Sequence, residues 1–309
     1  MEQYDVVIMG AGPAGLRCAD ILGGSDLSVL LLERKEIVGA KTCAGGLTVL
    51  DDSFPLPYEK TLSFRNQHVF FGGKEHTLSL KNPIRVIDRT ELGQYQLDRL
   101  KGFQNITVRI GTSVERVDGS HVVLHDGSTV SFRYLVGADG ASSMVRRHLK
   151  LENRIYMGMQ YVIPGKHDKM VWFFNPKLLG SGYAWIFPHK TFVSSGVFYN
   201  PLLISAQNAK RALHEFLDGY GLDYRAGKFE AAPINCCFKG ILFGNVFLAG
   251  DAAGLASAGT GEGISYALAS GEDAARNILD HTYPFTKLRS MIPFKERQER
   301  IASLFEGGK

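Results

Sequence analysis

The sequence predicts an α/β fold in which a Rossmann-like domain is interrupted by an inserted antiparallel β-sheet domain. Residues 4–15 combine a short apolar run, a glycine-rich turn and the start of a helix, which is typical of the first unit of a parallel sheet. Residues 245–254 repeat a buried-strand pattern followed by a second glycine-rich turn. Between them, residues 153–238 alternate polar and apolar positions and are rich in aromatic side chains, which favours antiparallel strands.

These patterns divide the chain into three parts. We expect a discontinuous first domain comprising residues 1–152 and 239–281, because the two glycine-rich turns belong to one type of sheet. The antiparallel-sheet domain comprises residues 153–238, and residues 282–309 form a short helical tail.

Apolar periodicity and turn signals place the individual elements. Residues 4–9 form a strand, Pro13 suits the first positions of a helix ending near Leu22, and residues 28–32 form the next strand, which makes a βαβ unit. The later expected elements are short strands near 68–71 and 76–80, a helix at 90–101, a meander at 107–139, strands at 156–163, 169–174, 182–187, 191–199 and 228–238, and helices at 203–219 and 261–280.

The tail is expected to hold one short basic helix over residues 294–305, after an irregular stretch. Its apolar side chains, Phe294, Ile301, Leu304 and Phe305, fall roughly on one side of that helix. Such a face can dock on the body of the protein or rest on a membrane surface, and we expect docking.

Composition excludes several classes of protein. The chain has 309 residues, 45% of them hydrophobic and 21% charged, which is ordinary for a globular protein. Its net charge of +4 comes from scattered basic residues, so nucleic-acid binding is not expected. With no apolar run long enough to span a bilayer and no signal peptide, we expect a cytoplasmic monomer or dimer with at most peripheral membrane contact.

No metal site is expected, because the cysteines lack the spacing of metal ligands. Cys18, Cys236 and Cys237 are expected to be reduced thiols.

The first glycine-rich turn has the spacing of a nucleotide-binding turn. Gly10 and Gly12 let the backbone approach a pyrophosphate, and Gly15 lets the helix pack closely on the strand. Pro13 and Ala14 open the helix, whose N-terminus would face the phosphates. We therefore expect these five residues at a bound nucleotide.

An acidic residue ends the second strand of this unit. Glu33 stands where a carboxylate accepts hydrogen bonds from ribose hydroxyls, and Arg34 follows it. A carboxylate at this position disfavours a 2′-phosphate, so NADP is not expected as the resident nucleotide.

Two further turns place an acid beside a glycine. Asp139-Gly140 can bind a ribose or ribitol hydroxyl, and Gly250-Asp251 repeats this logic before a helix start that favours negative charge on a flavin ring. Close backbone approach to a flat ring is expected at Gly259, Gly261, Gly263 and Ile264.

Together the three turns resemble the FAD signatures of the aromatic-ring hydroxylase-like flavoprotein superfamily, in the same order along the chain. Arg89 matches the superfamily's arginine near the FAD pyrophosphate. The resemblance implies an FAD-binding domain of the hydroxylase type and an inserted domain for the substrate. No second Rossmann turn is found in the sequence, so we expect NAD(P)H or a reduced electron-carrier protein to act only as a transient donor.

A narrower resemblance is to the geranylgeranyl reductase family of FAD-dependent oxidoreductases. It rests on residues 41–46, 182–188 and 250–263. In that family the first segment lies near the flavin ring and the second lines an apolar tunnel. The resemblance therefore implies that Cys43, Ala44 and Gly45 contact the cofactor, and that Tyr183, Trp185, Phe187 and Pro188 line the site of a lipophilic substrate.

The resemblance also suggests Cys43, Tyr183 and Trp185 as candidate catalytic residues. Cys43 would assist proton delivery or shape the pocket, or be a small buried hydrophobic residue in a glycine-rich loop. Tyr183, Trp185 and Phe187 share one face of a strand, which suits an elongated apolar ligand but is also common in a plain hydrophobic core.

The expected activity is reduction of carbon–carbon double bonds in an isoprenoid or similarly lipophilic substrate, by hydride transfer from reduced flavin. One alternative is an FAD-dependent monooxygenase acting on an aromatic or polyketide substrate, and a flavin-dependent halogenase is a weaker one. A third alternative, of another class, is a non-catalytic flavin- or lipid-binding relative.

Overall fold

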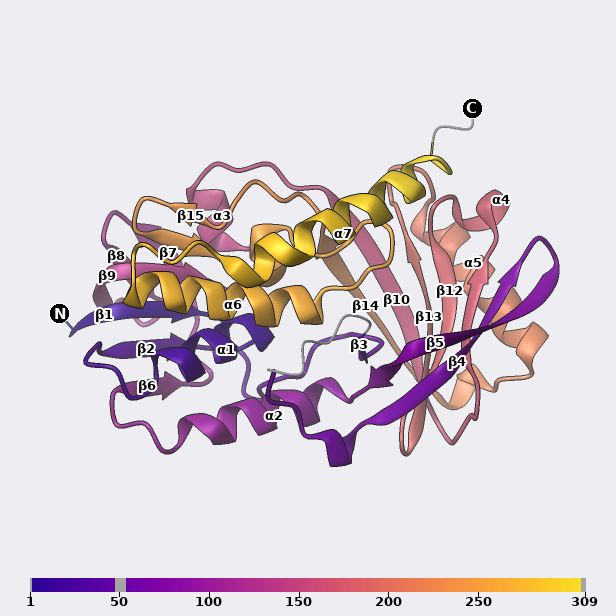
Figure 1. The fold of residues 1–309 in the computed structure, drawn as a ribbon, viewed down its shortest axis with the longest axis horizontal. Helices are drawn as coiled ribbons and strands as arrows, with labels where there is room; N and C mark the ends of the chain where they lie inside the picture. Colours follow the sequence, from indigo (N-terminus) through magenta and orange to yellow (C-terminus); the bar gives the residue numbers. More distant parts are fainter. Residues whose placement is uncertain (1, 48–53, 307–309) are drawn as a thin grey trace.

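The computed structural model describes residues 2–47 and 54–306. It contains two large β-sheets that lie beside each other, with most helices grouped around the first sheet (Figure 1). The long helix α7 runs from the first sheet toward the second and ends near the C-terminus of the chain (Figure 1).

The first sheet has the strand order β15-β16-β9-β1-β2-β6, with β7 and β8 joined beside β9. Its strands are β1 (Glu2–Met9), β2 (Val29–Leu32), β6 (Ile106–Arg109), β7 (Val114–Asp118), β8 (His121–Leu124), β9 (Thr129–Gly137), β15 (Leu242–Phe243) and β16 (Val246–Leu248). The pairs β1–β2, β1–β9, β2–β6 and β9–β16 are parallel. This arrangement confirms the predicted Rossmann-like sheet, built from both ends of the sequence.

Both faces of this sheet are covered. Val6 and Ile8 of β1 pack into the hydrophobic core on one face of the sheet, which also contains residues of α1. Val7 and Met9 pack into the core on the opposite face. This alternation explains why the strand reads as a continuous apolar run. The helices are α1 (Pro13–Leu22), α2 (Arg89–Leu100), α3 (Met144–His148), α4 (Pro176–Leu179), α5 (Ala206–Tyr220), α6 (Ile264–Leu279) and α7 (Thr286–Ser303), with short 3₁₀ turns at Tyr58–Lys60, Tyr224–Ala226 and Gly250–Ala253.

The second sheet has the order β14-β10-β13-β12-β11-β4-β5-β3. Its strands are β3 (Gly46–Leu47), β4 (Leu62–Phe71), β5 (Lys74–Val86), β10 (Ile155–Pro164), β11 (Met170–Phe174), β12 (Tyr183–Pro188), β13 (Phe192–Tyr199) and β14 (Lys228–Asn235). Helix α5 packs on one face, and the other face carries a buried aromatic cluster beside Ala256 and Ala258 of the first domain.

The predicted domain boundary is wrong for one stretch. Strands β3, β4 and β5 lie within residues 1–152, which were assigned to the first domain, yet they extend the second sheet. The link is a parallel pairing of β11 with β4, between residues 170–174 and 67–71. Such pairing joins strands far apart in sequence, so local patterns cannot reveal it.

The predicted start of the tail helix is also wrong. Helix α7 begins at Thr286 and contains Pro293, where a break was expected. Its first turn is stabilised from outside, because the Asp273 carboxylate of α6 accepts hydrogen bonds from the backbone N–H groups of Leu288 (2.8 Å) and Lys287 (3.4 Å).

The face by which α7 docks was also predicted wrongly. Its buried side chains are Leu288, Lys295 and Ala302, while Phe294, Ile301, Leu304 and Phe305 are exposed.

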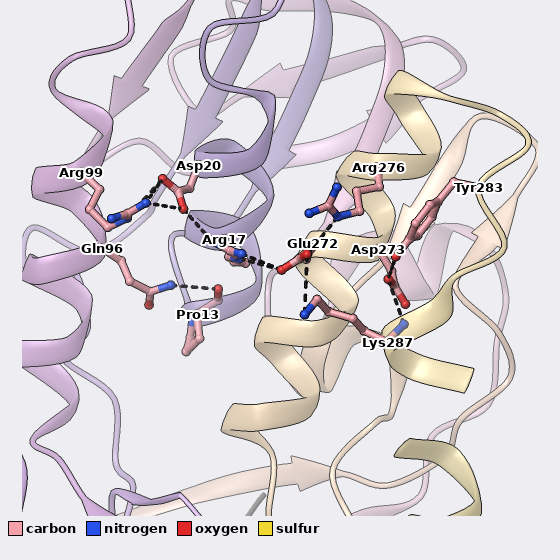
Figure 2. A network of polar contacts seen from close by, with 10 residues as sticks. All are labelled: Pro13, Arg17, Asp20, Gln96, Arg99, Glu272, Asp273, Arg276, Tyr283 and Lys287. Carbon is pink, nitrogen blue, oxygen red and sulfur yellow. Dashed lines mark hydrogen bonds and ion pairs between the residues drawn. The ribbon is translucent and has the colours of Figure 1, made fainter. Parts of the chain in front are cut away.

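A buried network of charges ties the helices together behind the first glycine-rich turn (Figure 2). Arg17 of α1 donates to Glu272 of α6 at 2.6 Å and to Asp20 at 2.7 Å, and Asp20 also pairs with Arg99 of α2. Charges shielded from water in this way must be paired to be tolerated, so the network fixes the position of α1 relative to α2 and α6.

No helix in the part of the chain described here is both long and apolar enough to cross a bilayer.

Candidate functional site

A cavity of about 690 Å³ lies between the two sheets. Its lining comes from all three predicted turns, the segment around Cys43 and the aromatic face of the second sheet. Folding thus brings together residues that are more than two hundred positions apart in the sequence. A large concave site with this mixture of backbone turns and apolar side chains suits an organic cofactor with a substrate beside it.

The glycines of the first turn have different roles. A Cβ atom on Gly10, whose φ is +103°, would lie 2.4 Å from the Ala138 carbonyl oxygen. One on Gly15 would lie 1.9 Å from the Gly10 carbonyl oxygen, and therefore Gly15 serves packing and is not in the cavity lining. A Cβ on Gly12 would meet nothing within 4 Å, because Gly12 faces the cavity.

This difference predicts two distinct mutant phenotypes. Gly12→Val is expected to fold with nearly wild-type stability but to bind FAD ten- to a hundredfold more weakly, since its methyl groups enter the ligand space at a cost of about 1–3 kcal/mol. Gly15→Val is expected to destabilise the apoprotein itself. Flavin fluorescence titration and urea unfolding of both variants check this, and equal unfolding midpoints for the two would contradict it.

The acid at the end of β2 is held against the turn. Glu33 Oε2 accepts from the Ala11 N–H at 2.8 Å and Oε1 accepts from the Lys35 N–H at 2.9 Å. Glu33 and Arg34 both line the cavity. Their contact with a ribose stays a prediction.

Two buried polar atoms at the cavity have no hydrogen-bond partner among residues 2–47 and 54–306. They are Nη1 of Arg89 and Oδ1 of Asp139. The other carboxylate oxygen of Asp139 accepts from the Met144 N–H at 2.6 Å, and burial raises the pKa of this carboxyl group. An unsatisfied buried donor and acceptor are costly, so both atoms fit a ligand that carries a phosphate and hydroxyl groups, as FAD does.

The third turn meets the segment that carries Cys43. The Lys41 ammonium lies 2.7 Å from the Asp251 carboxylate, and both residues line the cavity. Gly250, Gly261, Gly263 and Ile264 also line it, but Gly259 does not. Gly259 instead packs on α7, where a Cβ would lie 2.6 Å from the Gln298 carbonyl oxygen, so its predicted contact with the cofactor is not supported.

An aromatic wall forms the far side of the cavity. We use this name for Trp172, Tyr183, Trp185, Phe187 and Phe198, which all line it. Trp172 lies with its ring centroid 4.7 Å from that of Phe187 and 5.2 Å from that of Tyr183, within the range of favourable aromatic contacts. Pro188 was predicted with this group but is not in the lining.

The polar tips of the aromatic wall are bonded inside the protein. The Tyr183 hydroxyl donates to the Thr260 carbonyl at 2.6 Å, and burial raises the pKa of this phenol. Trp185 Nε1 donates to Ser194 Oγ at 2.9 Å, and Trp172 Nε1 to Gln67 Oε1 at 2.8 Å. This geometry favours a lining role for Tyr183 and Trp185 over proton transfer.

The loop that bears Cys43 is held by residues from the second sheet. Cys43 Sγ accepts from the Gly45 N–H at 3.4 Å, and Gln160 Nε2 lies 3.5 Å from the Cys43 carbonyl oxygen. His189 Nε2 lies 3.1 Å from the Ala44 carbonyl oxygen and, because a carbonyl only accepts, must carry the hydrogen. Sequence reasoning missed Gln160 and His189, which stand in no local motif.

His189 makes stability depend on pH. Burial lowers its pKa to about 4, although the Ala44 carbonyl and Asp88 favour the charged form. Between this value and the ordinary one near 6.5, the unfolded chain binds the proton and the folded chain does not, so stability falls as pH falls through this window.

From pH 7 to pH 5 the expected loss due to His189 is about 2 kcal/mol. His189→Gln keeps a donor for Ala44 without titrating, so urea unfolding at the two pH values should show a smaller loss in this variant. An equal pH dependence in both proteins would contradict the prediction.

Comparisons with known proteins place this chain in a family. Residues 1–51 match the model of the Thi4 family. The chain is 30% identical to an uncharacterized protein of Methanosarcina barkeri over 90% of its own length and 75% of that protein. It is 26% identical to digeranylgeranylglycerophospholipid reductase 3 of Methanosphaera stadtmanae, over 95% of this chain and 83% of the relative. The chain belongs to the geranylgeranyl reductase-like family of FAD-dependent oxidoreductases.

Solved structures agree with this assignment at the level of the fold. A geranylgeranyl bacteriochlorophyll reductase-like protein of Thermoplasma acidophilum has a TM-score of 0.79 at 21% identity, covering 98% of this chain and 85% of that one. PqsL, a probable FAD-dependent monooxygenase of Pseudomonas aeruginosa, has a TM-score of 0.70 at 18% identity, covering 99% and 95%. These likenesses concern the fold; together with the sequence relatives they support an enzyme of the FAD-dependent oxidoreductase or monooxygenase type.

Proposed function

We propose that this enzyme reduces carbon–carbon double bonds of an isoprenoid of the geranylgeranyl type, or of another lipophilic substrate, by hydride transfer from reduced flavin. The observation that carries the proposal is the aromatic wall, whose tips bond to Thr260, Ser194 and Gln67 and so leave apolar ring surface toward the cavity. Such a surface suits an alkene chain, and it offers no hydrogen bond to a polar group that would be buried against it. The similarity to digeranylgeranylglycerophospholipid reductase 3 supports the same class of substrate.

The side chains of this protein would have separate roles in the reduction. Arg89, Asp139 and the glycine turns would hold FAD, which would supply the hydride when bound and reduced. The aromatic wall orients the substrate and excludes water. The Cys43 thiol donates the proton to the second alkene carbon, which completes the saturated product.

The electrons would come from NAD(P)H or from a reduced electron-carrier protein that visits transiently. All three glycine-rich turns line the same cavity and would together hold one dinucleotide, FAD. This supports an electron donor that binds transiently and leaves after it has reduced the flavin.

The test is an anaerobic one. The FAD-loaded enzyme is photoreduced without oxygen and mixed with detergent-dispersed geranylgeraniol, a geranylgeranyl lipid or the saturated analogue phytanol. We expect reoxidation of the flavin with the unsaturated compounds only, and a mass gain of two hydrogens per reduced bond. Reoxidation by none of them would overturn the proposal.

The same preparation separates the monooxygenase alternative. A monooxygenase would leave the alkenes unchanged without oxygen and would insert oxygen into an aromatic substrate in air. The non-catalytic alternative would instead show tight lipid binding without flavin reoxidation.

A further inference from the structure

Six large apolar side chains that are exposed to solvent come from three separate segments. Leu178 belongs to α4, Leu202 and Leu203 follow β13, and Ile301, Leu304 and Phe305 lie at the end of α7. Leu202 is 87% exposed and Leu304 is 75% exposed, so they project from the surface and do not lie in a fold of it. Exposed apolar side chains gathered in this way mark an interaction surface.

One carboxylate brings the three segments together. Glu306 Oε1 accepts from Tyr156 and Ser181, each at 2.8 Å, and from Asn200 at 3.3 Å. Asn200 precedes Leu202, and Ser181 follows α4, so the end of α7 is held beside both. We call the six side chains and the basic residues around them the apolar-basic patch.

The basic residues of the patch are Lys177, Arg211, Arg297 and Arg300. Lys177 and Arg211 line a groove of about 370 Å³ between α4 and α5, together with Leu178 and Leu203. Arg297 and Arg300 lie one turn before Ile301 and Leu304 on the helix. Among the described residues, no carboxylate pairs with Lys177, Arg297 or Arg300 within 4 Å.

The mixture of groups indicates what the patch binds. Elements that lie on bilayers combine protruding leucine and phenylalanine with unpaired lysine and arginine, as this patch does. At the patch end of α7, the exposed charged side chains are Arg297, Arg300 and Glu296, because Lys295 is buried and pairs with Glu299. The charge therefore complements an anionic surface.

We propose that the apolar-basic patch docks this enzyme on the surface of an anionic lipid bilayer. The leucine, isoleucine and phenylalanine side chains enter the boundary between headgroups and acyl chains, and the lysine and arginine side chains contact lipid phosphates. Helix α7 lies on the membrane without crossing it. The inference rests on the proposed function in one respect: a lipophilic substrate would reach the enzyme from the bilayer.

Vesicle sedimentation tests the proposal with the FAD-loaded protein. Wild-type protein is mixed with vesicles of phosphatidylcholine alone, or of equal parts of phosphatidylcholine and phosphatidylglycerol. We expect binding to the second type only, weakened by salt because the headgroup attraction is screened. The double variant Leu202→Asp/Leu304→Asp and the charge-reversal variant Arg297→Glu/Arg300→Glu should each lower the partition coefficient at least about tenfold.

A matched control uses exposed apolar residues elsewhere. Leu78 of β5 and Leu279 of α6 are half exposed, so Leu78→Asp/Leu279→Asp should bind as the wild type does. Absence of binding by the wild type, or equal loss in the control, would overturn the proposal. So would a dimer without lipid that Leu202→Asp/Leu304→Asp dissociates, because the patch would then bind a second copy.

The result is independent of the proposed activity. The vesicles contain no isoprenoid substrate, and the anaerobic assay uses detergent-dispersed compounds. Failure of docking therefore leaves flavin reoxidation intact, and failure of turnover leaves vesicle binding intact.

Discussion

Replacing Arg146 with methionine is expected to lower the free energy of unfolding of the apoprotein by about 4 kcal/mol. The Arg146 guanidinium is buried and donates to three backbone carbonyls: to Ala252 at 3.0 Å, to Cys237 at 2.6 Å and to Glu152 through Nε at 2.9 Å. Methionine has similar length but no donor, so three carbonyl groups lose their partner. Each unsatisfied buried group costs about 1–3 kcal/mol.

These carbonyls belong to parts of the molecule that build the cavity. Ala252 lies in the third turn, Glu152 leads into β10, and Arg146 itself follows the second turn on α3. The cavity should therefore loosen as the fold weakens, and FAD affinity should fall as well. Urea unfolding measures the first effect and fluorescence titration the second.

The neighbouring arginine provides the control. Arg147 is exposed and donates to the Ser142 carbonyl, so Arg147→Met should change the stability of the apoprotein by less than about 1 kcal/mol. Equal stability of the two variants would show that the buried guanidinium is not needed by the fold.

Replacing Cys43 with alanine is expected to slow anaerobic flavin reoxidation by the alkene about 100-fold. A positioned proton donor contributes at least this factor in enzymes generally. The Cys43 side chain lines the cavity next to Ala44, and His189 and Gln160 hold the carbonyl groups of this loop. Because alanine keeps the backbone in place, FAD should bind as tightly as in the wild type.

Stopped-flow absorbance of the flavin after photoreduction measures this rate, and titration of the apoprotein measures FAD affinity. Cys237 is half-buried and outside the cavity lining, so Cys237→Ala is the matched control and should react at the wild-type rate. An unchanged rate in Cys43→Ala would mean that this thiol only fills space. A solvent deuterium effect present in the wild type but altered in the variant would support proton transfer from Cys43.

Several features of the site were predictable because their signals are local. Gly10, Gly12 and Glu33 lie in one short unit in which turn geometry dictates the residue types, and all three line the cavity. Asp139 was predicted from its Asp-Gly turn and Arg89 by resemblance, and each has a buried atom without a hydrogen-bond partner among the described residues. The order of these motifs was enough to predict the fold.

Other features depend on contacts between distant segments. No local sequence pattern in residues 62–86 indicates that they join the second sheet, because their partner strand β11 lies about a hundred residues later. Likewise, Pro293 suggested a helix boundary, yet Asp273 of another helix caps the chain at Leu288 and lets α7 begin earlier.

The sequence by itself determined the Rossmann-like core, the glycine turns and the class of cofactor, since a tight turn against a phosphate permits few residue types. Only the tertiary structure decided which face of α7 is exposed, how β4 and β5 complete the second sheet, and that the aromatic tips bond to the protein and not to a ligand. The physical reason is that exposure, long-range strand pairing and the satisfaction of buried polar atoms depend on neighbours that are distant along the chain.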